Sequence, residues 1–482
     1  MGELNINFLS IAPQLVLVCF GFLLMLIGGF TKISKSGYLG QVSALGIAIA
    51  FAVNIFLFGN RKLGFSNIIL YDELVGIFNI IFFVSGFLVC LFSDNYIEGK
   101  VKHTGEYYAL ILFAIAGMSF MVSSLDFLIL FLGLEMMSLS VYVLAGLFKQ
   151  SERSVESAMK YFLLGSFSTA LFLLGVAFLY GTFGTTNFAY MLQHFTKFFM
   201  DGKSLPLLVG SALVFSGVVF KIAAVPFHMW TPDVYEGAPT TVTAFMATAV
   251  KAAAFSMLFR IYLLGLRGVV VDYVGIIAYL SVFTMTLGNL SALAQKSVKR
   301  MLAYSSIAHA GYLLVGFTSL NQIGLGAVIF YLISYTLMNI GAFAVISFFE
   351  RETHSTELTH LAGKGFKHPF LGFMMVIFMF SLAGVPPTSG FAGKFYIFTG
   401  AVQSGYVSLA IIGVLNSAIS AYYYLRVLVY MYFKDSEDQY STVKITAPQV
   451  VAILIAALGV VNIGILPGRL FDITIKSVAF LF

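Results

Sequence analysis

Apolar runs long enough to cross a lipid bilayer recur along the whole chain of 482 residues. Hydrophobic residues make up 60% of the sequence and charged residues only 10%, a balance that soluble domains do not reach. The runs are continuously apolar, which predicts helices rather than the alternating strands of a membrane barrel. We therefore predict an all-α polytopic membrane protein with about 14 transmembrane helices. The expected spans are 8–30, 38–58, 74–92, 107–123, 126–148, 157–183, 207–226, 240–264, 269–294, 301–320, 323–349, 370–400, 405–432 and 448–467.

The loops predict how these spans are oriented. The first span starts close to Met1 and has no recognisable cleavage site, so we interpret it as a retained helix. Lys and Arg are roughly twice as frequent in the loops after odd-numbered spans as in the other loops. By the positive-inside rule, the odd-numbered loops face the cytoplasm and both termini face the periplasm.

A short sequence recurs inside two of the spans. Residues 222–226 (IAAVP) resemble residues 382–386 (LAGVP), and each segment places a proline where it interrupts a helix. Paired interruptions of this kind are typical of transporters with repeated halves and discontinuous helices. We predict discontinuous helices near Pro226 and Pro386. The whole chain is then one membrane domain, 1–482, with a first five-helix repeat over about 107–264, a second, inverted repeat over about 269–432, and flanking helices in 1–106 and 433–482.

Charged residues inside the spans carry the functional hypothesis. A charge near the bilayer centre costs from ~3 to over 10 kcal/mol, so it rarely persists without a use. Glu135 is the one carboxyl group that we place deep in a span, and we expect it to pair with Lys221. Lys251 has small neighbours that leave room for water, and Lys394 is the natural terminal donor toward the periplasm. We interpret these four residues as groups that hold and pass protons.

Each of these charges also has a structural interpretation. Glu135 could be a protonated, hydrogen-bonded carboxyl group, and Lys221 could extend its ammonium group to the membrane surface. Lys394 could be an interfacial lysine, because its span is rich in glycine. The sequence leaves these alternatives open.

Two histidines extend the hypothesis. His309 is a candidate relay between the two halves, because imidazole titrates near neutral pH. His228 follows Pro226 in the interrupted segment and is a candidate for proton uptake, although a structural role suits both histidines as well.

The remaining motifs exclude several classes of site. Cys19 and Cys90 fall in apolar spans and form no cluster, so the chain offers no iron–sulfur or zinc pattern and no metal site is expected. No glycine-rich phosphate loop follows a strand, and the net charge of +6 belongs to membrane loops rather than to a nucleic-acid surface.

Three long motifs resemble one protein family. They are FKIAAVPFHMWTPDVYEGAPTTVTAFMATAVKAAAF (220–255), SVKRMLAYSSIAHAGYLLVGF (297–317) and SLAGVPPTSGFAGKFYIF (381–398). Together they resemble the antiporter-like membrane subunits of bacterial respiratory complex I, the proton-pumping NADH–quinone oxidoreductase. The chain length and Lys394 are most similar to the N-type subunits. The chain departs from many relatives at Thr241, where they carry a second proline.

The resemblance implies a role for each candidate residue. Glu135 and Lys221 would form the coupling pair, Lys251 the central relay, His309 the link between halves and Lys394 the exit lysine. The family also implies a place in the bacterial inner (plasma) membrane, in contact with lipid, a neighbouring antiporter-like subunit and small membrane subunits. FMN, iron–sulfur clusters and quinone would belong to partner subunits, and this chain would hold no cofactor.

A second hypothesis uses the same lysines. Related proteins are subunits of multi-component cation/proton antiporters, which have no redox link. The overall likeness to N-type subunits favours proton pumping coupled to quinone reduction.

Overall fold

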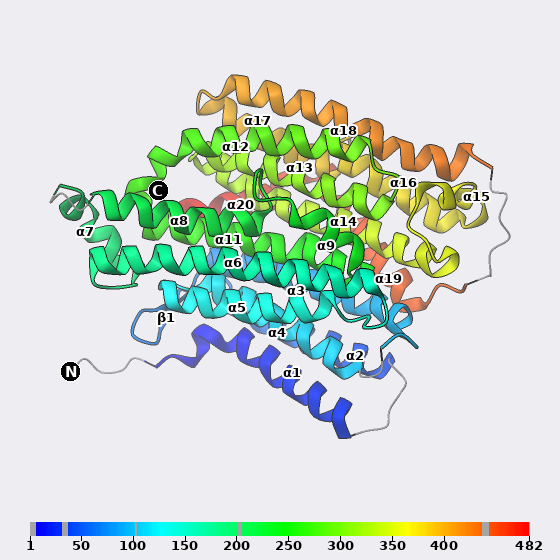
Figure 1. Cartoon of the computed structure of the whole chain (residues 1–482), viewed down its shortest axis with the longest axis horizontal. Helices are drawn as coiled ribbons and strands as arrows, with labels where there is room; N and C mark the ends of the chain where they lie inside the picture. The colour runs from blue at the N-terminus through cyan, green and yellow to red at the C-terminus, as the bar shows by residue number, and fades with distance from the viewer. Residues whose placement is uncertain (1–5, 31–36, 102–103, 201–203, 436–442, 482) are drawn as a thin grey trace.

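A computed structural model describes residues 6–30, 37–101, 104–200, 204–435 and 443–481. Most helices run along the long axis of the molecule, from α1 at one edge to α17 and α18 at the other (Figure 1). The first half comprises η1 (Phe8–Ile11), α1 (Ala12–Phe30), α2 (Gly37–Leu57), β1 (Lys62–Gly64), β2 (Ile69–Tyr71), α3 (Glu73–Ile97), α4 (Thr104–Ser123), α5 (Phe127–Ala145), α6 (Glu152–Phe183), α7 (Phe188–Met200), α8 (Ser204–Ile222), α9 (Trp230–Gly237), α10 (Thr240–Phe245), η2 (Met246–Val250), α11 (Lys251–Arg260) and η3 (Ile261–Gly265). The second half comprises α12 (Arg267–Leu293), α13 (Val298–Thr318), α14 (Gln322–Thr353), η4 (Leu358–Leu361), α15 (Lys364–Lys367), α16 (Pro369–Ala383), α17 (Ser389–Gln403), α18 (Val407–Phe433), α19 (Ala447–Ile465), α20 (Pro467–Val478) and η5 (Ala479–Leu481).

The all-helical membrane fold predicted from the apolar runs is confirmed. Within the described residues, twelve helices are long and apolar enough to cross a membrane. The two other expected spans are also helical, but α13 begins at Val298 and contains Lys299 and Arg300 in its first turn, and the span expected over 370–400 is divided into α16 and α17. The total of about 14 crossings and the inverted repeat therefore stay predictions.

The helix interruptions near the two prolines are confirmed. After α8 the backbone enters the left-handed region at Ala223 (φ 65°), and after α16 it does so at Gly384 (φ 90°). In both places the next amide reaches back five residues, from Ala224 to Val219 and from Val385 to the Phe380 carbonyl. The unwound carbonyls and amides that result are the polar groups that a buried charge needs.

The register of the internal repeat differs from the prediction by one residue. The sequence comparison aligned Pro226 with Pro386, but the matching hydrogen bonds and left-handed residues align it with Pro387. The letters IAAVP and LAGVP align well because both contain small residues before a proline. Backbone hydrogen bonding instead places Gly384, which has no Cβ, at the left-handed position.

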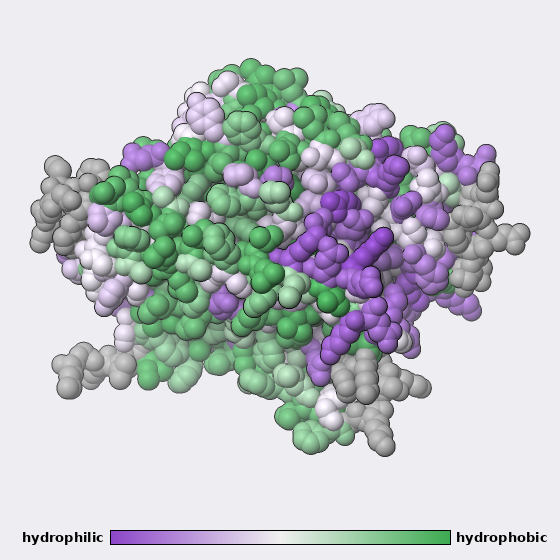
Figure 2. Space-filling view, in the orientation of Figure 1, coloured by the Kyte–Doolittle hydropathy of each residue, from purple (hydrophilic) through white to green (hydrophobic). Residues whose placement is uncertain are grey.

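The loops gather at two opposite ends of the bundle. Those after odd-numbered spans lie at the end where α9 and α15 are found, which we call the odd-loop end (Figure 1). Those after even-numbered spans lie with α7 and the short β1–β2 hairpin at the even-loop end. The side of the molecule seen in Figure 2 is largely apolar, as expected for contact with lipid, except for a hydrophilic region toward the odd-loop end.

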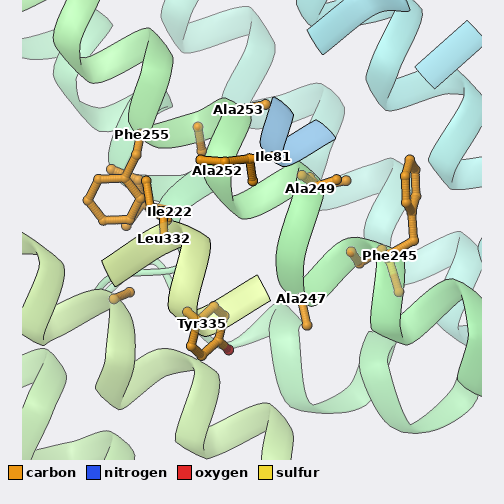
Figure 3. Close-up of a cluster of buried hydrophobic side chains, with 14 of the residues drawn as sticks. Ile81, Ile222, Phe245, Ala247, Ala249, Ala252, Ala253, Phe255, Leu332 and Tyr335 are labelled. Carbon is orange, nitrogen blue, oxygen red and sulfur yellow. The ribbon is translucent and has the colours of Figure 1, made fainter. Parts of the chain in front are cut away.

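The segment 240–265 forms the centre of the bundle. It is one continuous helical span whose apolar window is 100% buried, and η2 and η3 are π-helical turns within it. A π-helical turn inserts an extra residue into the helix and often marks a functional position. Figure 3 shows the tight packing that small side chains allow here, with Ala249, Ala252, Ala253 and Phe255 among Ile81 of α3, Ile222 of α8 and Leu332 of α14.

Candidate functional site

Lys221 lies in the last turn of α8, immediately before the first helix interruption. Its side chain is only 4% exposed, so it does not extend to the surface of the bundle. The ammonium group donates hydrogen bonds to Ser138 Oγ (2.9 Å) and Tyr142 Oη (3.2 Å), both on α5. It also lies 5.4 Å from the centre of the Tyr142 ring and 5.9 Å from that of Tyr161. Neutral oxygens and aromatic faces therefore hold this buried cation.

Glu135 lies on the same helix as Ser138, one turn earlier. Among the described residues Glu135 forms no ion pair with Lys221 within 4.0 Å, because the lysine reaches Ser138 and Tyr142 instead. Its Oε1 atom is buried and has no hydrogen-bond partner in this part of the chain. The two members of the expected pair therefore form no direct ion pair, and the carboxyl oxygen without a partner suits a bridging water.

Lys251 follows the π-helical turn η2 and is 2% exposed. Its ammonium group donates a hydrogen bond of 2.6 Å to the Ser306 carbonyl of α13. The Ser306 hydroxyl is buried and has no hydrogen-bond partner in the described part of the chain. The central helix thus presents its cation directly to the second half of the chain.

His309 lies on α13, one turn after Ser306, and is 1% exposed. One ring nitrogen, Nδ1, lies 2.6 Å from Tyr331 Oη, and the other, Nε2, lies 2.8 Å from Tyr424 Oη. A neutral imidazole donates at one nitrogen and accepts at the other, so it connects two hydroxyls in series. Lys251 and Lys394 are the charged groups whose fields reach this ring.

Lys394 lies on α17, and its ammonium group is held at the second helix interruption. It donates hydrogen bonds to the Leu382 (3.1 Å) and Ala383 (3.0 Å) carbonyls at the end of α16, and to Ser417 Oγ (2.8 Å). A helix C-terminus carries partial negative charge and unpaired carbonyls, which suit a cation. Lys394 is therefore a buried, ordered lysine of the bundle interior.

A row of polar side chains leads from His309 toward the surroundings of Lys394. The ring of Tyr424 packs against that of Tyr423 (centroids 4.5 Å apart), and the Tyr423 hydroxyl donates to Asn289 Oδ1 (2.8 Å). Asn289 Nδ2 donates to Tyr312 Oη (3.1 Å), and the Lys394 ammonium group lies 5.1 Å from the centre of the Tyr312 ring.

His228 is the one candidate that these contacts do not include. It lies in the exposed segment between α8 and α9, partly buried, and its Nδ1 atom has no hydrogen-bond partner in the described part of the chain. Its role in proton uptake stays a prediction.

Sequence reasoning missed a polar groove at the odd-loop end. The groove has a volume of about 1370 Å³ and corresponds to the hydrophilic region in Figure 2. Glu350, at the end of α14, accepts hydrogen bonds from Tyr96 Oη (3.0 Å) and Thr240 Oγ1 at its inner wall. Lys299 is 2% exposed and donates to the Ala238 carbonyl. Glu350 directly follows the span expected over 323–349. Its partners Tyr96 and Thr240 are 254 and 110 residues away in the sequence, so no local motif indicates the site.

Ion pairs order the outer part of this groove. Asp233 on α9 accepts from Lys160 (2.9 Å) and Arg300 (2.9 Å). Burial raises the pKa of Asp233, but the hydrogen bonds from Lys160 and Arg300 outweigh this and hold the pKa below its ordinary value. Burial lowers the pKa of Lys100 on the opposite wall. The lining of the groove therefore includes a carboxylate whose negative charge is stabilised, Asp233, and a lysine whose positive charge is destabilised, Lys100.

Comparisons with known proteins identify the family. Residues 124–420 match the family described as NADH:quinone oxidoreductase/Mrp antiporter, TM. The chain belongs to this family. It is 47% identical to the NADH-quinone oxidoreductase subunit N of Trichlorobacter lovleyi over 98% of this chain and 97% of that protein.

Solved structures agree with this assignment. A chain of respiratory complex I from Thermus thermophilus superposes with a TM-score of 0.81 and 31% identity, covering 95% of this chain and 98% of that one. A chain of the Mrp complex from Dietzia sp. has a TM-score of 0.85 at 20% identity, covering 98% of both chains, which shows the shared fold alone. The protein is thus a multi-pass membrane subunit of this family.

The hydrogen bond from Lys221 to Ser138 can be tested with two serines on α5, Ser138 and Ser140. In membranes that carry the assembled complex, we expect Ser138→Ala to lower NADH:quinone turnover by roughly three- to tenfold, because it removes a charge-assisted hydrogen bond from Lys221. Ser140→Ala is the control, since Ser140 donates to the Met136 carbonyl of its own helix and, within the described residues, has no bond to Lys221. Equal turnover in both variants, at matched complex content, would show that Ser138 does not set the state of Lys221.

Proposed function

We propose that this chain is a proton-translocating membrane subunit of an NADH-quinone oxidoreductase. One observation carries the proposal: Lys221, Lys251, His309 and Lys394 are all buried, on α8, α11, α13 and α17, in a chain that is 47% identical to a subunit N. Three buried lysines and a partly buried glutamate in membrane helices would be costly as structural elements alone.

The relay that we infer runs in the order of the contacts. Glu135 responds to the neighbouring subunit and changes the proton affinity of Lys221 through Ser138 and water. Lys251 passes a proton through the surroundings of Ser306 to His309. The imidazole can accept at one nitrogen while it releases at the other, which suits transfer between two tyrosine hydroxyls.

Lys394 completes the relay on the other side of His309. Its three acceptors are neutral, so the ammonium group has no fixed carboxylate that would hold its proton permanently. A lysine in such surroundings can alternate between charged and neutral states. We propose that Lys394 releases protons to the opposite side of the membrane.

The groove at the odd-loop end supplies protons in this proposal. Glu350 lies at its inner wall and touches Tyr96 and Thr240, and Thr240 begins the helical segment that carries Lys251. Lysine- and arginine-rich loops surround this end, which supports a cytoplasmic orientation. Both termini then face the periplasm, and the membrane is the bacterial inner membrane.

Electron transfer belongs to the partner subunits. FMN, iron–sulfur clusters and quinone are the cofactors that an NADH–quinone reaction requires, and we assign them to other chains of the complex. The residues described above bind and move protons; energy from quinone reduction reaches them through contact with neighbouring membrane subunits.

The alternative is a cation/proton antiporter subunit. Its support is the fold shared with the Mrp complex, which extends over 98% of the chain. The higher identity to a subunit N and to the complex I chain favours redox-driven pumping.

Removing the Lys221 ammonium group tests the core of the proposal. We expect Lys221→Ala to assemble and to lose most quinone-linked NADH oxidation and most acidification of inverted membrane vesicles, because the relay loses its first proton carrier. Lys221→Arg keeps the charge but cannot release a proton, so we expect a similar loss. Unchanged acidification and oxidation in both variants would contradict the assignment of this lysine.

Glu135 offers a graded test. We expect Glu135→Ala to impair turnover strongly, whereas Glu135→Asp keeps the negative charge and retains a substantial part of the activity. NADH oxidation and vesicle acidification should fall together in the alanine variant. If the aspartate variant is as inactive as the alanine variant, the position of the carboxyl group matters more than its charge.

The orientation is tested by thiol labelling. In a chain with Cys19 and Cys90 replaced by alanine, Asn67→Cys lies on the exposed hairpin and Lys149→Cys on an odd-numbered loop. A membrane-impermeant maleimide should label Asn67→Cys in spheroplasts and Lys149→Cys only in inverted vesicles. The reverse pattern would overturn the predicted orientation.

A further inference from the structure

A buried ion pair lies outside the proton relay. Arg260, at the end of α11, is 0% exposed, and its Nη2 atom lies 2.8 Å from Asp72 Oδ1. The Arg260 Nε atom donates to the Val122 carbonyl in the last turn of α4 (2.5 Å). Asp72 also accepts from the Val75 amide and so caps the start of α3. One guanidinium group therefore joins three helix ends at the even-loop end.

The pair lies at the end of the helical segment that carries Lys251, opposite the polar groove of the odd-loop end. Arg260 is nine residues beyond Lys251 on the same helix, roughly 13 Å farther toward the even-loop end at ~1.5 Å per residue. Asn79 on α3 and Ser119 on α4 lie at intermediate depths, judged from their distance to the same helix ends.

This region is polar enough to hold water. Buried oxygens of Gln14, Asn79 and Ser119 and one oxygen of Asp72 have no hydrogen-bond partner in the described part of the chain, and neither does Nη1 of Arg260. Such atoms are commonly satisfied by buried water. A chain of water between Lys251 and the even-loop end would conduct protons past His309 and dissipate the gradient.

A guanidinium group is suited to block that route. It stays protonated in proteins, so it can neither accept nor release a proton, and its charge repels one that approaches. Fixed arginines exclude protons from water-filled pores in the same way. A purely structural role explains less, because a buried ion pair is often replaced by neutral residues at little cost in stability.

We propose that Asp72 and Arg260 form an electrostatic barrier that closes the even-loop end of the first half to protons. A proton on Lys251 then cannot leave through the even-loop end of the first half. Arg260 acts here on the proton path and not on substrate, so it is a positioning residue. The inference rests on the proposed proton-pumping function.

The test compares proton leak with turnover. Asp72→Asn keeps the cation, whereas Asp72→Asn combined with Arg260→Gln leaves a polar but uncharged lining. In inverted vesicles without NADH, we expect the double variant to speed the collapse of an imposed pH gradient severalfold over wild type, while Asp72→Asn does not. With NADH, the double variant should keep oxidising NADH at matched complex content but acidify the lumen less per NADH.

A second variant and a matched control complete the experiment. Arg260→Lys keeps the ion pair but introduces a group that can release a proton, so it should also leak. Arg426→Gln is the control, because Arg426 bonds the Leu293 and Gln295 carbonyls at the odd-loop end. A leak at the wild-type level in the Arg260 variants that assemble would overturn the barrier. If the wild type itself fails to pump, the proposed function falls, whatever the leak.

Discussion

An ammonium group inside a lipid bilayer must find oxygen atoms to replace water, and the architecture of this protein is arranged around that requirement. Each of the three lysines in the relay meets it with neutral acceptors. Lys221 uses two side-chain hydroxyls, Lys251 uses a backbone carbonyl, and Lys394 uses two carbonyls and a hydroxyl. A carboxylate would hold each cation firmly and keep its proton in place. Neutral acceptors stabilise the ammonium charge enough for burial, and they still allow the lysine to lose its proton.

Interrupted helices supply some of those acceptors, and they do so differently in the two halves. Both α8 and α16 end with a left-handed residue and the same five-residue back-bond. In the second half Lys394 binds the carbonyls that this ending exposes. In the first half Lys221 belongs to the ending helix itself and turns to α5, where Ser138 lies one turn from Glu135. Two similar helix ends therefore hold their lysines differently. Lys221 bonds hydroxyls on the helix that carries Glu135, whereas Lys394 bonds backbone carbonyls.

The two ends of the first half are built for opposite purposes. The odd-loop end is open and polar, with Glu350 at the inner wall of a large groove. The even-loop end is closed by the buried pair of Asp72 and Arg260. A proton path with one open and one blocked end gives transfer a direction, provided that the central lysine can pass its proton sideways. The contact of Lys251 with α13 provides that sideways step.

The sequence by itself determined the helical class, the apolar segments long enough to cross a membrane, the two interruptions and the position of four charged residues within those segments. These follow from local composition, because a bilayer selects apolar runs and penalises every charge within them. Tertiary structure alone decided which groups touch. Lys221 bonds Ser138 rather than Glu135, and Arg260 pairs with Asp72, 188 residues away in the chain. Such partners depend on how helices rotate and pack against one another, and no short stretch of sequence encodes that rotation.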